Sequence, residues 1–127
     1  MQIIKFNDLK FIPASHEDFQ NPGVWKKVLL KKEDLTAGRV QMINWAKLPK
    51  NNSFKPHYHQ DMTEVFIILN GQVKMNVDQE GKVLGKGDAV IVPPNKVHQM
   101  RNLTNEDVEY ICIGITTEQN GKTIVIR

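Results

Sequence analysis

Hydrophobic and polar residues alternate along much of the chain, in short runs that are separated by turn-forming residues. Alternation at every second position is typical of a strand with one buried face, and almost no segment has the spacing of an amphipathic helix. The pattern predicts about ten short strands. They cover residues 24–32, 39–48, 56–59, 65–69, 73–77, 82–84, 89–92, 97–103, 108–115 and 123–126.

Turn-forming residues indicate how these strands connect. Asn70-Gly71 lies between the runs 65–69 and 73–77, and such a pair predicts a two-residue hairpin. The first of these runs is apolar on both faces, which predicts a central, buried strand. Residues 33–38 predict a connection with a helical turn. Many short strands at close intervals favour an all-β fold, an antiparallel sandwich or barrel.

The N-terminal segment, residues 1–24, is less regular. Residues 3–6 and 9–12 are short apolar runs that end at Pro13, and we expect edge strands that pack on the barrel or on a partner. These runs and residues 123–126 are apolar and terminal, so they would be exposed edges in a lone barrel. Pairing across a two-fold axis would cover them, and we therefore expect a homodimer.

Composition limits the class of protein. The chain has 127 residues, of which 40% are hydrophobic and 24% charged, and we expect one domain over residues 1–127. The net charge of +3 is scattered, and no basic patch is interleaved with aromatic residues, so we expect no nucleic-acid partner. The single cysteine, Cys112, allows no disulfide within the chain, and no run approaches the ~20 apolar residues of a membrane helix. We expect a cytoplasmic protein without membrane contact.

The candidate chemistry begins with His57 and His59. Side chains two positions apart in a strand point to the same face, and two imidazoles near a carboxylate are typical metal ligands. Glu64 supplies a carboxylate, but its odd spacing from His59 would place it on the opposite face of a straight strand. Residues 60–63 must therefore form a turn or bulge if these side chains converge. His98 begins a further strand, and separate strands of a closed barrel can aim side chains at one interior point.

Simpler interpretations stay open for the same residues. The histidine pair also fits an exposed strand whose Tyr58 faces the core, and a buried Glu64 also fits an ion pair with a lysine. His16 lies in a polar loop without a second donor at ligand spacing, and we predict a surface histidine. We predict that Cys112 is a buried structural cysteine, and the alternative is a cysteine that faces the cavity.

From residue 51 to residue 102 the chain resembles the two motifs of the cupin family. The first motif is Gly, five residues, His-x-His, three or four residues, Glu, six residues, Gly. The second is Gly, five residues, Pro-x-Gly, two residues, His, three residues, Asn. The chain matches these motifs at His57, His59, Glu64, Gly71, Gly87, Pro93, His98 and Asn102. Asn51 and Asn95 stand where the family has glycine, and asparagine tolerates the left-handed conformation that such turns need.

This resemblance implies a jelly-roll β-barrel that holds one divalent transition metal per chain. The implied ligands are His57, His59, Glu64 and His98. Fe, Mn, Ni, Cu, Co and Zn all suit such histidine-rich ligation. An inward Glu64 would bring apolar residues of the same faces into the pocket lining, namely Phe66, Ile68, Met75 and Met100, with Met42 as a further candidate.

Small members of the family include dioxygenases, isomerases, epimerases and decarboxylases. The resemblance therefore implies a metalloenzyme that acts on a small substrate with a chelating end. We find no general base beyond the ligands, which favours dioxygenase-like oxidation over isomerisation. The alternative is a non-catalytic sensor or binding protein for a small carboxylate or sugar.

Overall fold

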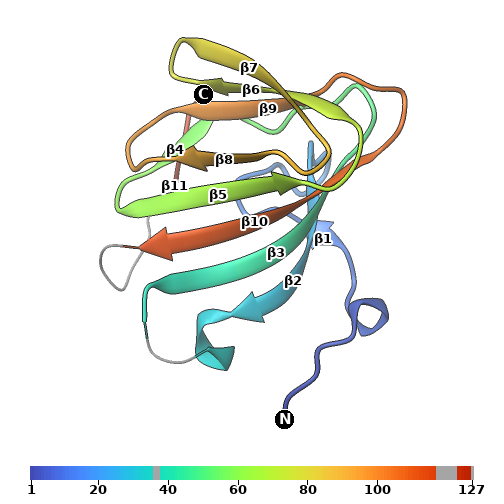
Figure 1. Ribbon diagram of the computed structural model, residues 1–127, viewed down its shortest axis with the longest axis vertical. Coiled ribbons are helices and arrows are strands. Elements are labelled where there is room, and N and C mark those ends of the chain that lie inside the picture. The colour runs from blue at the N-terminus through green and yellow to red at the C-terminus, as the bar shows by residue number, and fades with distance from the viewer. Residues whose placement is uncertain (36–37, 117–122, 127) are drawn as a thin grey trace.

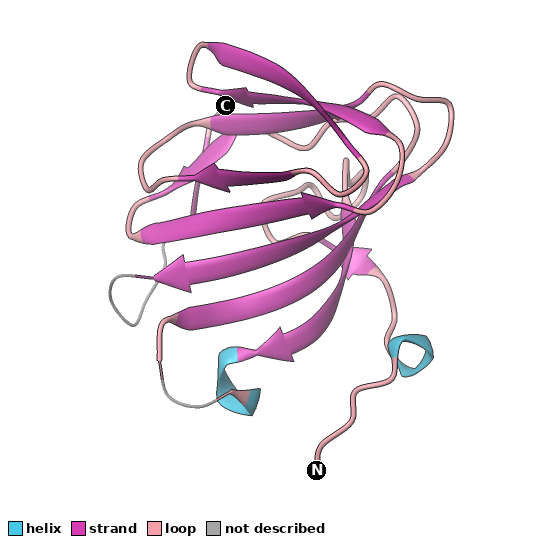
Figure 2. Cartoon of the chain, viewed as in Figure 1, coloured by secondary structure: helices cyan, strands magenta, loops and turns pink. Residues whose placement is uncertain are grey.

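Two antiparallel sheets face each other in the molecule (Figures 1 and 2). The computed structural model describes residues 1–35, 38–116 and 123–126. Its strands are β1 (Ile12–Pro13), β2 (Trp25–Lys31), β3 (Val40–Leu48), β4 (His57–His59), β5 (Met62–Ile68), β6 (Gln72–Val77), β7 (Glu80–Gly85), β8 (Ala89–Val92), β9 (His98–Asn102), β10 (Val108–Thr116) and β11 (Thr123–Val125). The six-stranded sheet has the order β1-β2-β3-β10-β5-β8, and the five-stranded sheet has the order β11-β4-β9-β6-β7. This arrangement confirms the predicted antiparallel jelly-roll barrel.

All ten predicted strands are present within the described residues. The largest shift of a strand end is at β5, which begins at Met62 instead of residue 65. The helical turn expected between residues 33 and 38 is the 3₁₀ turn η2 (Lys32–Asp34), while residues 36–37 lie outside the described part of the chain. Hydrophobic alternation therefore located the strands, because a half-buried strand must place apolar residues at every second position.

The N-terminal segment departs from the prediction. The expected strands at residues 3–6 and 9–12 are wrong except for the last residue, which begins the short β1. Instead, the 3₁₀ turn η1 (Phe6–Asp8) packs on the six-stranded sheet through its side chains. The ammonium of Lys27 donates to the Phe6 carbonyl at 2.9 Å and lies 3.5 Å from the centroid of the Phe6 ring. Side-chain contacts thus replace the backbone ladder that an edge strand would form.

The Asn70-Gly71 turn does not join two paired strands, so the predicted hairpin is wrong. β5 pairs with β10 and β8, whereas β6 pairs with β7 and β9, and the chain crosses here between the sheets. The Asn70 Nδ2 donates to the Asp107 carbonyl at 2.9 Å, and the Glu109 N–H donates to Asn70 Oδ1 at 2.7 Å. These bonds tie the crossing to the start of β10. The local signal therefore produces a bend but does not decide which strands pair.

The same change of sheet explains the orientation of Glu64. β4 and β5 lie in different sheets, and the chain between them bends only at residues 60–61. Residues 62, 64, 66 and 68 of β5 are buried, while residues 63, 65 and 67 are half-buried. Glu64 therefore faces the interior, and the turn is shorter than expected because the chain changes sheets there.

Asn102 is a polar side chain buried beside the apolar core, with 1% of its surface exposed. Its Nδ2 donates to the carbonyls of Leu48, Pro49 and Glu106 at 2.7–3.2 Å. Its Oδ1 accepts from the N–H and the hydroxyl of Thr104 at 2.8 and 2.7 Å. One amide thus joins the end of β3 to the turn that follows β9.

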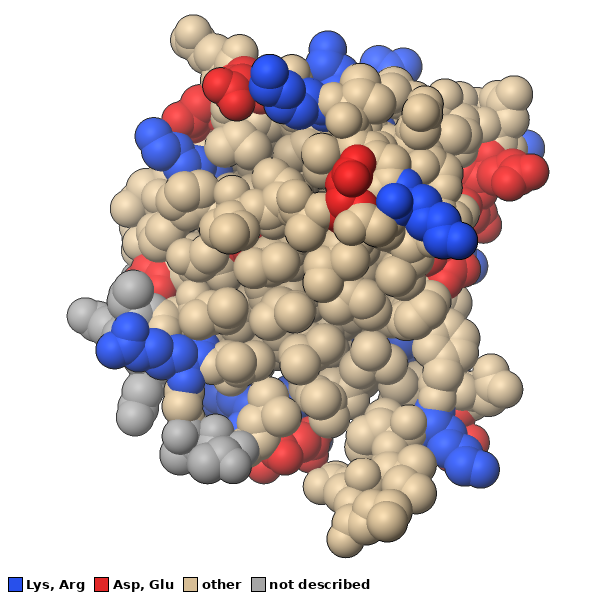
Figure 3. Space-filling model, in the orientation of Figure 1, with Lys and Arg blue, Asp and Glu red and all other residues tan. Residues whose placement is uncertain are grey.

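The surface carries mixed charge. On the face shown in Figure 3, basic and acidic side chains lie scattered around a mostly uncharged centre. Among the described residues, no helix has the length and apolar character needed to cross a membrane. The cytoplasmic location and the absence of a nucleic-acid partner stay predictions of the sequence.

Replacing Asn102 tests the importance of this amide for the fold. We expect Asn102→Ala to lower the free energy of unfolding by about 2–4 kcal/mol, because three backbone carbonyls and the N–H and hydroxyl of Thr104 lose their partner. The matched control is Asn105→Ala in the same turn, where the side chain is exposed and a change within about 0.5 kcal/mol is expected. Urea denaturation followed by circular dichroism measures both, and equal stability of the two variants would contradict the role given to Asn102.

Candidate metal centre

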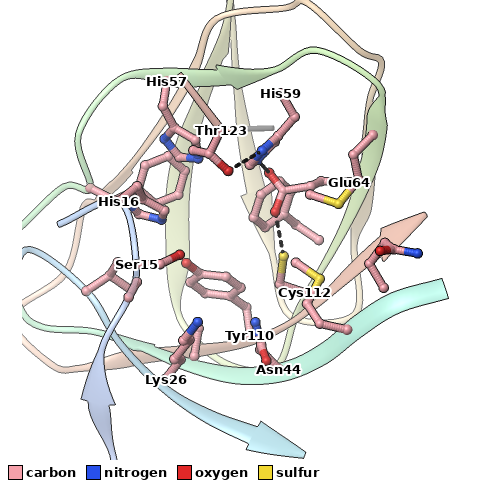
Figure 4. Close-up of a pocket in the computed structure, with 18 of the residues that line it drawn as sticks. Ser15, His16, Lys26, Asn44, His57, His59, Glu64, Tyr110, Cys112 and Thr123 are labelled. Atoms are coloured by element: carbon pink, nitrogen blue, oxygen red, sulfur yellow. Dashed lines mark hydrogen bonds and ion pairs between the residues drawn. The ribbon is translucent and has the colours of Figure 1, made fainter. Parts of the chain in front are cut away.

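Four buried side chains converge where the two sheets meet. His57 and His59 come from β4 and His98 from β9, and His57 is paired with His98 across the five-stranded sheet. Glu64 comes from β5 of the six-stranded sheet and points toward the histidines (Figure 4). One potential ligand atom of each residue lies within 4.8 Å of those of the others. The structure thus brings together all four residues that the motif resemblance selected.

Two histidines are oriented by backbone carbonyls. His57 Nδ1–H donates to the carbonyl of Lys55 at 2.7 Å, and His98 Nδ1–H donates to the carbonyl of Lys96 at 3.0 Å. In each case the carbonyl belongs to the residue two positions earlier. A neutral imidazole that donates from Nδ1 has its lone pair on Nε2, so these bonds select the tautomer that can bind a cation through Nε2.

The third histidine and the carboxylate complete the donor group. His59 Nε2 and His98 Nε2 lie 2.6 and 3.0 Å from Glu64 Oε1. On its other side, His59 Nδ1 lies 2.8 Å from the hydroxyl oxygen of Thr123 in β11. Thr123 is therefore an outer partner that orients His59, from a strand far away in the sequence.

The charge states of the group are set by its surroundings. Burial, together with the nearby imidazoles of His16 and His98, lowers the pKa of His57 to about 3, so this ring is neutral at pH 7. Burial alone would raise the pKa of Glu64, but the facing His59 and His98 hold it well below its usual range. The site therefore combines an ionised Glu64 carboxylate with a His57 ring that is neutral at pH 7.

This donor chemistry fits a divalent transition metal. A His98 ring that donates from Nδ1 turns the Nε2 lone pair toward the Glu64 carboxylate, and a cation between the two would remove the repulsion between them. Imidazole nitrogens with one carboxylate are the ligands that Fe, Mn, Co, Ni, Cu and Zn accept. The carbonyl and hydroxyl partners of the histidines supply the outer hydrogen bonds typical of such sites.

Cys112 lies in the cavity, where it contacts Glu64. It is buried, as predicted, but its thiol also donates to Glu64 Oε2 at 3.0 Å (Figure 4). Burial and the Glu64 charge raise the pKa of Cys112 well above its usual range, so it stays a thiol at neutral pH. The thiol engages one carboxylate oxygen and leaves Oε1 facing the histidines, which gives Cys112 a positioning role beyond packing.

The prediction of a surface position for His16 is wrong. Its ring stacks on that of His57 with centroids 4.0 Å apart and lines the cavity. Its Nδ1 lies 2.8 Å from Glu17 Oε2, which also accepts from the Lys55 N–H at 2.8 Å, and Glu17 Oε1 accepts from the Gly23 N–H at 2.7 Å. Burial raises the pKa of Glu17, but these hydrogen bonds outweigh it and leave the pKa lowered. Glu17 thus anchors the loop that carries His16 over the site.

Three of the four donors, His57, His59 and Glu64, line a cavity of about 210 Å³ between the sheets, while His98 is not among its lining residues. Phe66 and Met42 line this cavity, as expected. The other three residues expected in its wall belong to the apolar core and are not among the lining residues, namely Ile68, Met75 and Met100. They share inward faces with the donors but lie farther along the strands, where facing side chains fill the interior.

Further polar side chains line the cavity beside the donor group. Lys26, Asn44 and Tyr110 face the donor group from the six-stranded sheet (Figure 4). Burial lowers the pKa of the Lys26 ammonium and raises the pKa of the Tyr110 hydroxyl well above its usual range. At neutral pH the tyrosine is therefore a hydrogen-bond donor. The alternation of polar and apolar residues shows that these side chains share a face, but no local motif marks them as cavity residues.

Both asparagines at the expected glycine positions are left-handed. Asn51 has a φ of 61° and Asn95 a φ of 66°. The Asn95 N–H donates to the carbonyl of His59 at 2.7 Å, so this turn also holds β4 in place. Asparagine therefore serves in both motif turns as expected.

Comparison with known proteins identifies the family. The family model described as a cupin domain matches residues 44–114. An uncharacterised protein of Methanocaldococcus jannaschii is 29% identical over 90 residues, which cover 71% of this chain and 72% of that protein. Quercetin 2,3-dioxygenase of Bacillus subtilis is 42% identical over 53 residues, covering 42% of this chain and 16% of the enzyme. H2HPP isomerase of Bacillus subtilis is 31% identical over 77 residues, covering 60% of this chain and 31% of the enzyme. The chain therefore spans less than a third of either enzyme.

Solved structures share the fold. A predicted oxalate decarboxylase from Thermotoga maritima superposes with a TM-score of 0.79 at 21% identity, over 91% of this chain and 99% of that one. A sugar phosphate isomerase from Silicibacter pomeroyi has a TM-score of 0.77 at 16% identity, over 98% of this chain and 82% of that one. At these identities the likeness concerns the fold and not the reaction.

The anchor of the His16 loop gives a pH-dependent prediction. We expect Glu17→Gln to lower the free energy of unfolding at pH 7 by about 1–3 kcal/mol, because the amide cannot accept all the hydrogen bonds of the carboxylate. The pKa of Glu17 is lowered in the folded protein, so its contribution is present above the ordinary value of 4.5 and is lost as the pH falls through the folded pKa. The difference in the free energy of unfolding between wild type and Glu17→Gln should therefore become smaller below pH 4.5.

Urea denaturation at a series of pH values measures this difference. The control is Asp18→Asn, which removes the neighbouring, exposed carboxylate and should leave the stability at pH 7 nearly unchanged. A difference that is constant from neutral to acid pH would show that the ionised form of Glu17 is not what anchors the loop.

Proposed function

The chain belongs to the cupin family, and from this premise we propose that it is a metalloenzyme acting on a small substrate with a chelating end. One divalent transition metal would be held by His57, His59, Glu64 and His98. The observation that carries the proposal is the convergence of these four buried side chains, with potential ligand atoms within 4.8 Å of one another. The outer hydrogen bonds of His57 and His98 support it, because each ring donates from Nδ1 to a carbonyl and keeps its lone pair on Nε2.

The favoured reaction is a dioxygenation. A divalent transition metal supplies Lewis acidity and, where it is redox-active, a route for electrons between substrate and dioxygen. A dioxygenation that places both oxygen atoms in the substrate balances without an external reductant. The similarity to quercetin 2,3-dioxygenase over 53 residues supports this choice.

The residues of the chain would prepare the site for such chemistry. Cys112 holds one oxygen of Glu64, so that the other faces the histidines. Phe54 and Phe66 form an apolar wall, with the Phe54 centroid 5.2 Å from that of His57. These rings exclude water from one side of the donors. The small cavity limits the substrate to a compact molecule.

Isomerisation or decarboxylation is the second candidate, and His16 is the observation that favours it. An isomerase needs a group besides the ligands that moves a proton. His16 places a non-ligand imidazole on the cavity wall, hydrogen-bonded to Glu17. The similarity to H2HPP isomerase over 77 residues agrees with this candidate. The third candidate is a non-catalytic protein that holds a small carboxylate or sugar in the same cavity.

Metal content and turnover test the proposal in one preparation. We expect protein purified without chelator to carry about one transition-metal ion per chain in elemental analysis. Once loaded, it should consume oxygen with at least one member of a panel of catechols, diketones and thiol acids. Glu64→Gln should lower the metal affinity at least about 100-fold, since the loss of an outer partner alone costs about 10–100-fold.

The matched control is Glu80→Gln, which neutralises an exposed glutamate of β7 and should leave metal and turnover unchanged. Wild-type protein that carries no metal would refute the site. So would a Glu64→Gln variant that binds the metal as tightly as wild type does. Full loading without oxygen consumption would instead reject the dioxygenase, and substrate loss without oxygen uptake would favour isomerisation or decarboxylation. Binding without any substrate loss would favour the sensor or binding protein.

We also propose a homodimer. Besides the apolar terminal segments, one face of the molecule supports this proposal. The half-buried outer face of the six-stranded sheet is apolar on three adjacent strands, at Ile43, Val65, Ile67, Ile111 and Ile113. Figure 3 shows the mostly uncharged face over these strands. Light scattering should give twice the chain mass of 14.6 kDa, and Ile67→Lys should lower it. A mass of 14.6 kDa at every concentration would exclude the dimer.

A further inference from the structure

Three polar side chains of the cavity wall remain without a role in the metal centre. Lys26 comes from β2, Asn44 from β3 and Tyr110 from β10, all on the inner face of the six-stranded sheet (Figure 4). Lys26 and Tyr110 are both paired with Ala46, which lies on the strand between them. Because Ala46 contributes only a methyl group, the two longer side chains flank an open space. Asn44 lies two residues before Ala46 on the same face of β3 and is paired with Cys112.

Asn44 has an unmet hydrogen bond. Its side chain lines the cavity, and 6% of the residue surface is exposed. Its Oδ1 is buried and has no hydrogen-bond partner among the described residues. Buried acceptors are nearly always paired, because an unpaired one loses its hydration without compensation. Asn44 Oδ1 is therefore a hydrogen-bond acceptor in the cavity wall that a bound ligand could pair with.

Lys26 and Tyr110 present unmet donors beside it. No ion pair within the described residues involves Lys26. The nearest candidate by position, Glu64, has both oxygens engaged by His59, His98 and the Cys112 thiol. The Tyr110 hydroxyl likewise has no hydrogen-bond partner in the described part of the chain, although 3% of the residue surface is exposed.

We propose that Lys26, Tyr110 and Asn44 form a subsite for the carboxylate of a small substrate that carries a hydroxyl or amine next to that carboxylate. The Lys26 ammonium and the Tyr110 hydroxyl donate to the carboxylate oxygens, and Asn44 Oδ1 accepts from the neighbouring O–H or N–H. The subsite rests on the proposed function, because it names the substrate class for the same cavity. The chelating end of the substrate reaches the donor group, whose histidines lie on the facing sheet and whose Glu64 lies on the same sheet as the subsite.

The charge of the wall favours a carboxylate over a phosphate. One ammonium balances one carboxylate, whereas a phosphate dianion in proteins draws several charged or backbone donors, commonly from arginine or a helix N-terminus. The cavity lining contains no arginine among the described residues, and no helix begins there. The cavity volume of about 210 Å³ also favours a compact acid.

Lactate and its neutral analogue lactamide are the probes. Binding to metal-free protein is followed by titration calorimetry and by the amide NMR signals of β2 and β10. We expect lactate to bind more tightly than lactamide, because only lactate pairs with the Lys26 ammonium. Lys26→Met keeps the length of the side chain and should weaken lactate binding about tenfold. Lys74→Met, on an exposed position of β6, is the matched control and should leave it unchanged.

Asn44→Leu separates binding from stability. The substitution removes the unpaired acceptor at similar volume, so the thermal midpoint should stay equal or rise. Lactate binding should nevertheless weaken. A merely structural role for Asn44 would produce the opposite pattern, a lower midpoint with unchanged binding.

The outcomes distinguish the subsite from the metal centre. Equal affinity of lactate for wild type and Lys26→Met overturns the subsite, as does lactamide binding as tightly as lactate or the absence of lactate binding. Metal content is measured on the same preparations. A protein that takes up no metal contradicts the proposed function, while lactate binding that depends on Lys26 still supports the subsite.

Discussion

The Glu64 carboxylate is buried where the two sheets meet, and the arrangement around it follows from what that carboxylate needs. Burying an ionised group is costly unless charges or donors surround it. Glu64 Oε1 faces His59 and His98 on the opposite sheet, and Oε2 accepts from the Cys112 thiol on its own sheet. The Cys112 hydrogen bond offsets part of this cost, and a cation held between Oε1 and the facing histidine nitrogens would offset more of it. The same groups join the two sheets and assemble the donor group.

Polar groups in the interior are of two kinds. Asn102 has its amide oxygen and nitrogen bonded to neighbouring backbone and side-chain groups, and it holds the turn between β9 and β10. Asn44, also buried, has an acceptor without a partner in the described structure. A buried amide with its partners stabilises the fold, whereas one without them weakens it. Unmet polar groups therefore gather along the cavity, where a substrate can pair with them, and not in the core.

The donor residues and the wall residues differ in how visible they are in the sequence. His57, His59, Glu64 and His98 stand at motif spacing, so the resemblance selected all four. His16 and Tyr110 carry no such spacing, because they reach the cavity from an N-terminal loop and from β10. Hydrophobic alternation placed Ile68 on the inner face correctly, but it could not tell the cavity from the packed core. Both lie on the same face, at different distances along the strands.

The sequence by itself determined the positions of strands β2 to β11 and the donor set, because these depend on period-two burial and on short motifs. It also indicated left-handed turns at Asn51 and Asn95, which follow from the local tolerance of asparagine. Only the tertiary structure decided that the chain crosses between sheets at Asn70-Gly71, since strand pairing depends on partners distant in the sequence. It also decided that His16 stacks on His57 in the donor group and that Lys26 lines the same cavity. Those positions are set by the packing of two sheets and a loop, which no local pattern encodes.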